Sequence, residues 1–259
     1  MTGVKLMKFI PENSSDSFQQ LGFFVIEKFL SDAEVAQIHA ELSRVQKDVI
    51  PKMPASEVYY DQKGDSNSLK QLQRLHLHDT FFNTLLINSP FQKIAEHLLG
   101  EPVAGKNLQY FNKSPVVSQP TPPHQDGYYF MIEPVKAVTL WLALDHVDEG
   151  NGCVRYLPKS HLHGLRPHSR TGTLGFSQGI TDYGNENDLA DEIPLCCAPG
   201  TLIGHHANTV HRADQNYSLN RDRRAIGLIY YAASVSEDET GHNNYQASLV
   251  KDLQEDNLI

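Results

Sequence analysis

The second part of the chain is a series of short β-forming segments separated by turns, and this pattern limits the fold more than any other feature. The segments follow Glu101 and read PVAGKNLQYFNK, AVTLWLALDHV, NGCVRYLP, PLCCAPGTLIGHH and RRAIGLIYYAAS. They are rich in β-branched and aromatic residues, and the dipeptide Pro199-Gly200 is a strong turn signal before the strand GTLIGHH. Many short strands with few helices predict a β-sandwich or a barrel.

Helical signals concentrate in the first hundred residues. Ser31 and Glu34 form a capping box, and the apolar residues after them recur at helical spacing up to Val49. A second helical segment covers residues 79–100, breaks at Ser89-Pro90 and ends at Gly100, which suits a C-cap. The segment GFFVIEKFL, directly before the first helix, has the composition of a strand. We expect these helices to support a sheet.

The length of 259 residues is within the range of one β-sandwich or barrel domain, and no repeat or linker divides the sequence. We therefore expect a single domain over residues 1–259, with a helical part at about 14–100 and a β core at about 101–235. Residues 61–70 read as a surface loop. Residues 161–192 are polar and too long for a simple connection, so we expect a lid or a binding loop there.

The net charge of −9 disfavours a nucleic-acid or anionic-membrane partner. No stretch approaches the roughly 18 apolar residues that a membrane helix needs, and the N-terminus lacks the apolar core of a signal peptide. The three cysteines are odd in number, and the adjacent Cys196 and Cys197 cannot bridge without strain. A reduced, cytoplasmic protein is the expectation. The oligomeric state is left open.

The most informative motif is HQD in TPPHQDGYYF. On an extended strand, residues i and i+2 point to the same face, so His124 and Asp126 present an imidazole and a carboxylate side by side. A third ligand is available in the later segment GTLIGHHANTVHRADQN, where the spacing alone does not choose among His205, His206 and His211. Two histidines and one carboxylate hold Fe(II) on one face and leave the other positions open. Zinc with a water ligand stays possible from the ligand types.

A lone HxD match is weak, but its combination with a late histidine after a strand and an arginine on the next strand is more specific. The sequence resembles the phytanoyl-CoA dioxygenase family of iron(II)- and 2-oxoglutarate-dependent oxygenases. The matching segments occur in the family's order and cover most of the chain: GFFVIEKFLS, NKSP, HQD, VTLWLALDHV, EGNGCVRYLPKSH, PGTLIGHHANTVHRADQN and RRAIGLIY. The resemblance implies a mainly β fold with peripheral helices, a double-stranded β-helix or cupin-like jelly roll. It also implies His124, Asp126 and His211 as the iron ligands.

The resemblance further implies 2-oxoglutarate and O2 as cosubstrates, and a dicarboxylate needs a cation at its far end. We expect Arg223 to bind that carboxylate. Neighbouring strand residues face opposite ways, so Arg224 is the alternative, and Arg221, which shares the parity of Arg223, is a weaker one. Other positions that match cosubstrate contacts or site-facing groups in relatives are Gln125, Trp141, Gln109 and Lys113. For Trp141, plain packing in the sheet core is the alternative role.

Several aromatic and basic residues are candidates for the rest of the site. Tyr128 shares the strand parity of His124 and Asp126 unless Gly127 introduces a bulge, and Tyr110 lies near the same site. We expect Tyr128 and Tyr110 to contact substrate. Tyr129, Arg74, His76 and His78 could approach the site, although a supporting or surface position is more ordinary for them. The segment HLHGLRPH lacks a second carboxylate at matched spacing, so we interpret it as part of a lid and not as a metal site.

The resemblance implies hydroxylation of an unactivated C–H bond of a small organic substrate, with release of succinate and CO2. Relatives that halogenate carry a small residue where this chain has Asp126, so hydroxylation is favoured over halogenation. The alternatives are desaturation or demethylation by the same cofactors, and a jelly-roll binding protein without turnover. The acidic net charge and the absence of a basic patch disfavour an acyl-CoA, so we expect a small polar or natural-product molecule.

Overall fold

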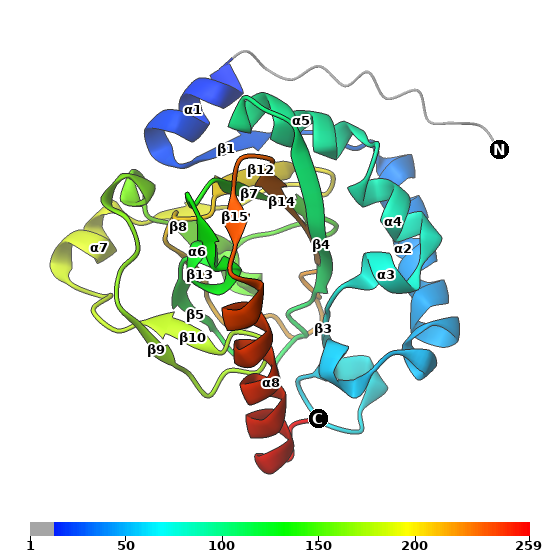
Figure 1. The fold of residues 1–259 in the computed structure, drawn as a ribbon. Helices are drawn as coiled ribbons and strands as arrows, with labels where there is room; N and C mark the ends of the chain where they lie inside the picture. The colour runs from blue at the N-terminus through cyan, green and yellow to red at the C-terminus, as the bar shows by residue number, and fades with distance from the viewer. Residues whose placement is uncertain (1–12) are drawn as a thin grey trace.

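Two antiparallel sheets face each other in the computed structural model, which describes residues 13–259 (Figure 1). The larger sheet has seven strands in the order β1 (Phe23–Ile26), β12 (Leu202–His206), β7 (Ala137–Ala143), β14 (Ala225–Ala232), β4 (Val103–Phe111), β3 (Leu69–Leu72) and β2 (Val58–Tyr60). The smaller sheet has the order β11 (Ile193–Leu195), β8 (Val154–Tyr156), β13 (His211–Ala213) and β5 (Thr121–His124). This is the predicted double-stranded β-helix.

Two short pairs lie outside these sheets: β6 (Ile132–Glu133) with β15 (Ser236–Glu237), and β9 (His168–Arg170) with β10 (Gln178–Ile180). The α-helices are α1 (Asn13–Leu21), α2 (Asp32–Asp48), α3 (Leu75–His78), α4 (Thr80–Leu86), α5 (Pro90–Leu99), α6 (Asp126–Phe130), α7 (Glu186–Asp191) and α8 (Glu239–Glu255). Short 3-10 helices cover Ile50–Lys52, Ala55–Glu57, Ser66–Ser68, Glu149–Asn151 and Ser160–His163. No helix among residues 13–259 has both the length and the apolar character that crossing a membrane requires.

Helices α2, α4 and α5 have the boundaries that the sequence predicts, whereas α1 and α3 were not predicted. The side chain of Ser31 accepts a hydrogen bond from the backbone N–H of Glu34, and the Glu34 carboxylate accepts one from the Ser31 backbone N–H, which completes the capping box of α2. Ser89 caps α5, and Gly100 ends it in the left-handed conformation with φ at 71°. These helices cover the outer face of the large sheet (Figure 1).

The central strand β14 shows how the sheet separates a core from a site. Ile226, Leu228 and Tyr230 belong to the main hydrophobic core, which lies between the sheet and the N-terminal helices. Ile229 and Tyr231 point to the other face and line a cavity between the two sheets. The strand is apolar on both faces because both faces are buried.

The expected division at residue 100 corresponds only partly to the structure, because β1, β2 and β3 come from the first hundred residues and join the large sheet. Residues 61–70 are not a surface loop throughout. Ser68, Leu69 and Lys70 are buried, and Leu69 begins β3. The polar residues Lys70 and Gln71 hid the strand signal, since a strand that lines a polar cavity does not alternate with solvent.

The C-terminal helix α8 was not predicted. It begins after the N-cap Asp238, and Tyr245, Leu249 and Leu253 follow every fourth residue, which is the helical signal that could have revealed it. Its side chains form part of the cavity wall.

Candidate metal centre and active site

His124, Asp126 and His211 converge between the two sheets, with one ligand atom from each within 4.8 Å of the others. His124 ends β5, and His211 begins β13 directly opposite it in the strand register. Asp126 is the first residue of α6, so the chain is extended only as far as Gln125. The Oδ1 atom of Asp126 lies 3.5 Å from Nε2 of His124 and 3.8 Å from Nε2 of His211.

Backbone carbonyls fix the tautomer of both imidazoles. Nδ1–H of His124 donates to the carbonyl of Pro122 at 2.8 Å, and Nδ1–H of His211 donates to that of Thr209 at 3.0 Å. In the neutral imidazole each Nε2 then carries the lone pair, and both Nε2 atoms face the Asp126 carboxylate. This is the tautomer that a metal-binding imidazole needs.

The other oxygen of Asp126 is occupied by hydrogen bonds from the large sheet. Oδ2 accepts a hydrogen bond from the hydroxyl of Thr139 at 2.6 Å and another from Nε2 of His205 at 3.1 Å. Nδ1 of His205 in turn accepts from the hydroxyl of Tyr156 at 2.9 Å. Only Oδ1 is free, so the carboxylate can offer a metal one oxygen.

This arrangement separates the three histidines that the spacing could not distinguish. His205 supports Asp126, and His211 faces it with a free Nε2. His206 lies away from the cluster, where its ring packs against Phe18 and His161 at centroid distances of 5.8 and 5.4 Å.

The local charges favour the protonation states that a divalent metal needs. Burial acts to raise the pKa of the Asp126 carboxyl, but the interactions with the neighbouring His124 and His205 side chains outweigh it and hold that pKa well below its usual range. Burial, and then the neighbouring His124 and His205, lower the pKa of His211 well below the ordinary histidine value. At neutral pH, His211 is therefore neutral and Asp126 is a carboxylate.

Removing the hydroxyl that holds Asp126 should weaken metal binding. We expect Thr139→Val to raise the dissociation constant for Fe(II) by about tenfold, because groups that orient a ligand typically contribute 10–100-fold to metal affinity. Anaerobic calorimetric titration with Fe(II) measures the effect. The matched control is Thr201→Val, since Thr201 is equally buried but its hydroxyl has no hydrogen-bond partner among the described residues. An equal loss in both variants would refute the role given to Thr139.

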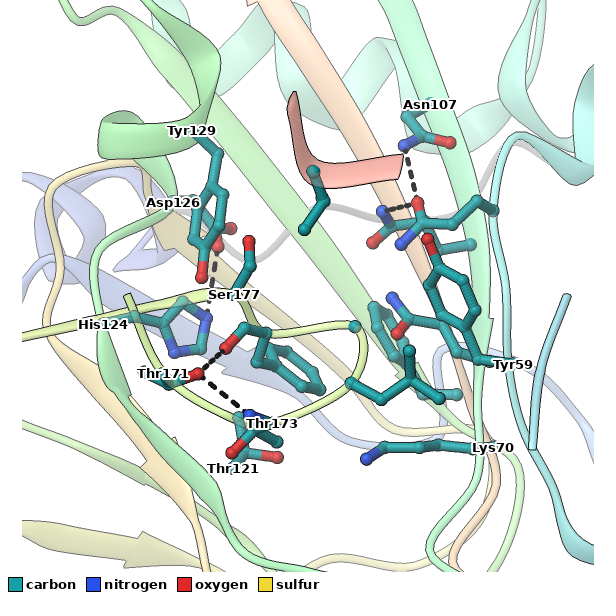
Figure 2. Close-up of a pocket in the computed structure, with 18 of the residues that line it drawn as sticks. Tyr59, Lys70, Asn107, Thr121, His124, Asp126, Tyr129, Thr171, Thr173 and Ser177 are labelled. Atoms are coloured by element: carbon teal, nitrogen blue, oxygen red, sulfur yellow. Dashed lines mark hydrogen bonds and ion pairs between the residues drawn. The ribbon is translucent and has the colours of Figure 1, made fainter. Parts of the chain in front are cut away.

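The metal cluster lies at one side of a cavity of about 770 Å³ between the sheets. In Figure 2, His124, Asp126 and Tyr129 line one wall, and Tyr59, Lys70 and Asn107 line the opposite wall. The segment Thr171–Ser177 and one face of α8 complete the enclosure. The volume is in the range of pockets that hold organic ligands, roughly 300–1,000 Å³.

Arg223 is a buried cation in this cavity, with a relative exposure of 4%. Its guanidinium carbon lies 5.5 Å from the centroid of the Trp141 ring. Within residues 13–259 the guanidinium has no carboxylate partner, and its Nε has no hydrogen-bond partner. Burial lowers the pKa of Arg223 to about 10, so the group is still charged at neutral pH.

The other two candidate arginines form ion pairs with carboxylates. Arg224 forms two hydrogen bonds of 2.8 Å with the carboxylate of Asp145. Arg221 pairs with Asp148 at the surface, at 2.7 and 3.1 Å. Arg223 is thus the one of the three whose charge is available inside the cavity.

Trp141, Gln109 and Lys113 also line the cavity, and Trp141 belongs to a buried apolar cluster as well. Lys113 is buried and donates to the carbonyl of Gln119 at 2.7 Å. Burial, and then the charges of Arg223 and Lys70, lower the pKa of Lys113 well below the ordinary lysine value. Gln109 donates to the amide oxygen of Gln73.

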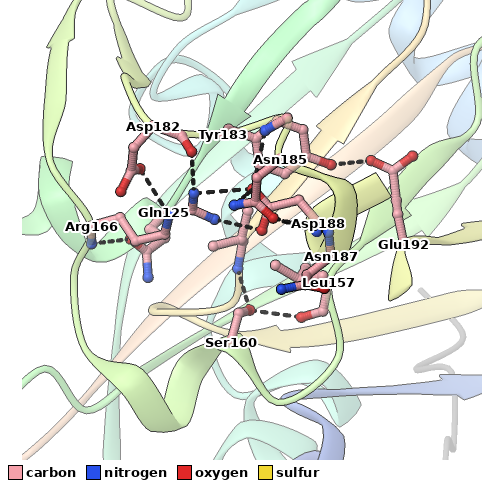
Figure 3. A network of polar contacts seen from close by, with 12 residues as sticks. Gln125, Leu157, Ser160, Arg166, Asp182, Tyr183, Asn185, Asn187, Asp188 and Glu192 are labelled. Carbon is pink, nitrogen blue, oxygen red and sulfur yellow. Dashed lines mark hydrogen bonds and ion pairs between the residues drawn. The ribbon is translucent and has the colours of Figure 1, made fainter. Parts of the chain in front are cut away.

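The predicted contact of Gln125 with 2-oxoglutarate is contradicted, because its side chain points away from the cavity. Its amide nitrogen donates to the carbonyls of Gly164 at 2.8 Å and Asn208 at 2.7 Å. Its amide oxygen accepts from the backbone N–H of Arg166 at 2.7 Å (Figure 3). Gln125 lies between the two ligands on the extended chain and therefore faces the opposite side. It holds two loops together.

The predicted substrate contact of Tyr128 is also wrong. The extended chain ends at Gln125 and turns into α6 at Asp126, so strand parity does not continue to residue 128. The ring of Tyr128 stacks on His168 at a centroid distance of 4.3 Å. Tyr129 lines the cavity instead, with its ring edge-on to His124 at 6.0 Å.

Tyr110 does not face the cavity either. Its neighbours Gln109 and Phe111 on β4 line the cavity, so Tyr110 points to the other face of the sheet and lies in the main hydrophobic core. Its placement follows from strand parity, which could have been applied to the sequence.

The remaining candidates have supporting positions. Arg74 lines the cavity and pairs with Glu57, and His78 also bonds to Glu57, at 2.5 Å. Nδ1 of His76 accepts from the backbone N–H of Leu108 at 3.3 Å.

In the segment HLHGLRPH, Arg166 binds the carboxylates of Asp182 and Asp188 and organises the long polar loop (Figure 3). No metal cluster forms within this segment, among the residues that the structure describes.

Three groups at the metal cluster were not predicted from the sequence: Thr139, Tyr156 and Phe176. His205 was considered there only as a possible third ligand, and it supports Asp126 instead. Thr139, His205 and Tyr156 form the support of Asp126 described above. Phe176 packs against His124 and Phe111, at centroid distances of 5.4 and 6.1 Å, and lines the cavity beside the cluster. These contacts join strands far apart in the sequence, so no local pattern signals them.

Comparison with known proteins decides the family. The sequence profile described as "Phytanoyl-CoA dioxygenase (PhyH)" matches residues 18–225. The chain belongs to the phytanoyl-CoA dioxygenase family. It is a 2-oxoglutarate-dependent non-haem iron dioxygenase, the enzyme class that the sequence predicts, with iron and 2-oxoglutarate as its cofactors.

The chain is similar in sequence to two relatives and in fold to one solved structure, among others. The chain is 30% identical over 230 residues to a "Probable alpha-ketoglutarate-dependent hypophosphite dioxygenase" of Stutzerimonas stutzeri, which covers 86% of this chain and 79% of the relative. It is 26% identical to the peroxisomal phytanoyl-CoA dioxygenase of Mus musculus, over 77% of this chain and 62% of the mouse protein. The fold matches the epimerase SnoN in complex with Fe3+, alpha-ketoglutarate and nogalamycin RO, with a TM-score of 0.70, 23% identity and coverage of 89% and 86%.

Proposed function

We propose that this dioxygenase hydroxylates a C–H bond of a small polar organic molecule, with His124, Asp126 and His211 as the iron ligands and Arg223 as the anchor of 2-oxoglutarate. The observation that carries the proposal is that one buried cavity contains both groups: a metal-ready cluster of two imidazoles and a carboxylate, and a guanidinium without a partner among the described residues. Oxygen and nitrogen donors of this kind suit Fe(II), and the three leave the remaining positions for cosubstrate and oxygen.

Held by His124, Asp126 and His211, iron with 2-oxoglutarate would supply the activation of O2 that places one oxygen atom in the substrate C–H bond and the other in succinate, with release of CO2. The chain's own residues supply geometry and charge. Thr139 and His205 hold Asp126 so that it offers one oxygen. The planar guanidinium of Arg223 can bind a carboxylate through two parallel hydrogen bonds, and Lys113 adds a nearby donor. Phe176 covers His124 and excludes water.

The wall opposite the metal cluster supports a polar substrate without high net charge. The basic groups Arg74 and Lys106 are paired with Glu57 and Glu237. Lys70 lies 3.7 Å from the carboxylate of Asp61.

The amides of Gln73, Gln109 and Asn107 form one hydrogen-bonded group on that wall. Such a surface suits hydroxyl or amide groups better than the phosphates of an acyl-CoA, although the mouse relative is named for one. Hydroxylation is preferred over desaturation or demethylation because the resemblance in sequence implies it.

The experiment is an anaerobically prepared, Fe(II)-loaded enzyme assayed for succinate with a panel of small polar metabolites and hypophosphite. We expect succinate to rise above the substrate-free rate with a polar organic compound. Its product should gain one oxygen atom, labelled when 18O2 is supplied. A product that loses two hydrogens or a methyl group would replace hydroxylation by one of the alternative outcomes. Tight binding of 2-oxoglutarate without any consumption across the panel would favour a binding protein.

A further inference from the structure

Two of the three cysteines lie opposite each other on neighbouring strands. Strands β8 and β11 are antiparallel, with Ile193 opposite Tyr156 and Leu195 opposite Val154. One step further in the same register places Cys196 opposite Cys153. Opposite Cα atoms in an antiparallel pair lie roughly 4.5–5.5 Å apart, inside the range of about 4.4–6.8 Å that disulfides require.

The two cysteines differ in their surroundings. Cys153 packs in the buried cluster that contains Val154 and Tyr156, and Cys196 lies opposite it, directly after the edge strand β11. Cys196 is exposed, and Cys153 is buried. Burial and the adjacent Cys196 thiol both raise the pKa of Cys153, to about 12.

We propose that Cys153 and Cys196 are a redox-active pair that forms a disulfide on exposure to a peroxide, and that this bond weakens the binding of 2-oxoglutarate. The sulfur of Cys196, which solvent can reach, attacks the peroxide, so that an S–O bond forms, the O–O bond breaks and one water leaves. The sulfur of Cys153 then displaces the second water as the S–S bond forms. Two thiols and one hydrogen peroxide give one disulfide and two waters. A cellular thiol reductant reverses the reaction.

The pair lies directly behind the cosubstrate-binding residues. Gly152, next to Cys153, has φ at +84°, and a Cβ on it would lie 2.8 Å from Cδ of Lys113. Cys153 also shares a buried cluster with Trp141, whose ring lies beneath the Arg223 guanidinium. Drawing Cys153 toward Cys196 moves the backbone on which Lys113 rests. The effect on 2-oxoglutarate binding rests on the proposed function, whereas the formation of the disulfide does not.

Cys197 provides a matched control on the neighbouring residue. Its backbone pairs with Val147, so Cys197 is opposite Val147 and not opposite Cys153. Cys196→Ser removes the exposed partner with little risk to folding, because that side chain is exposed.

The test uses protein loaded with zinc, which has no redox chemistry and therefore does not react with peroxide. The sample is treated with hydrogen peroxide, digested without reduction and analysed by mass spectrometry. Calorimetry then measures the affinity for 2-oxoglutarate before oxidation, after oxidation and after reduction with dithiothreitol. We expect a peptide linked through Cys153 and Cys196 in the parent and in Cys197→Ser, and none in Cys196→Ser. The affinity for 2-oxoglutarate should fall by about tenfold on oxidation, because one charge-assisted hydrogen bond is weakened. It should return to its first value on reduction.

The possible failures are distinguishable. A peroxide-treated parent without the linked peptide overturns the redox pair. A linked peptide with an unchanged affinity for 2-oxoglutarate overturns the proposal that the disulfide weakens cosubstrate binding. A reduced protein that does not bind 2-oxoglutarate at all would instead refute the cosubstrate role proposed for this cavity, while the linked peptide would still test the pair.

Discussion

His211→Ala is expected to abolish both Fe(II) binding and the formation of succinate from 2-oxoglutarate. The variant keeps His124 and Asp126, but two protein ligands leave the metal to be held mostly by water. The expected loss exceeds the roughly 10–100-fold that removal of a supporting group costs, because a direct ligand is lost. Metal content after gel filtration and anaerobic Fe(II) titration measure binding, and succinate formation measures turnover.

The matched control for this variant is His206→Ala. His206 lies in the same segment but packs against Phe18 and His161, away from the cluster. The control should keep its metal even if it loses some thermal stability, which a melting curve will report. If His211→Ala still binds one Fe(II) with the parental affinity, or if His206→Ala loses iron in a folded protein, the assignment of the distal ligand is wrong.

Arg223→Met is expected to raise the KM for 2-oxoglutarate by about 100-fold, with a smaller change in kcat at saturating cosubstrate. Two charge-assisted hydrogen bonds to a carboxylate are lost, each worth roughly 1.5–3 kcal/mol, and about 1.4 kcal/mol corresponds to tenfold. Methionine keeps the apolar volume above Trp141. The thermal stability should stay equal or rise, since the change removes a buried charge that has no carboxylate partner in the described part of the chain. Steady-state kinetics with a saturating second substrate, or calorimetry with 2-oxoglutarate alone, measures the effect.

Arg221→Met is the control for this change, because its guanidinium pairs with Asp148 at the surface and shares the strand parity of Arg223. It should leave the affinity for 2-oxoglutarate unchanged. Arg223→Lys should recover part of the loss, because it restores the charge but not the planar pair of donors. An unchanged affinity in Arg223→Met would move the anchor to another cation of the cavity, with Lys113 the first to test.

The local parts of the fold were predictable from sequence because they depend on neighbouring residues. The capping box at Ser31, the break at Ser89 and the end of the helix at Gly100 are each settled by the chemistry of one turn. Strand β3 was not predictable in this way. Its residues Lys70 and Gln71 face a polar cavity, so the hydrophobic alternation that reveals a strand is missing.

The same distinction applies to the candidate site: contacts between near neighbours in the sequence were predictable, and contacts between distant strands were not. The i and i+2 spacing brought His124 and Asp126 together correctly, because the chain is extended from one to the other. The same reasoning failed at Tyr128, where α6 begins. The proximity of His211 depends on strand pairing across more than eighty residues, and no local pattern encodes it. Sequence order could not choose between Arg223 and Arg224 either, whereas the ion pair with Asp145 removes Arg224.

A crystal grown anaerobically with Fe(II) and 2-oxoglutarate, measured on both sides of the iron absorption edge, tests the central claim most directly. The account predicts one anomalous peak, bound to Nε2 of His124, Nε2 of His211 and Oδ1 of Asp126. The far carboxylate of 2-oxoglutarate should lie against the guanidinium of Arg223. Iron at any other set of side chains, or a carboxylate directed away from Arg223, would contradict it.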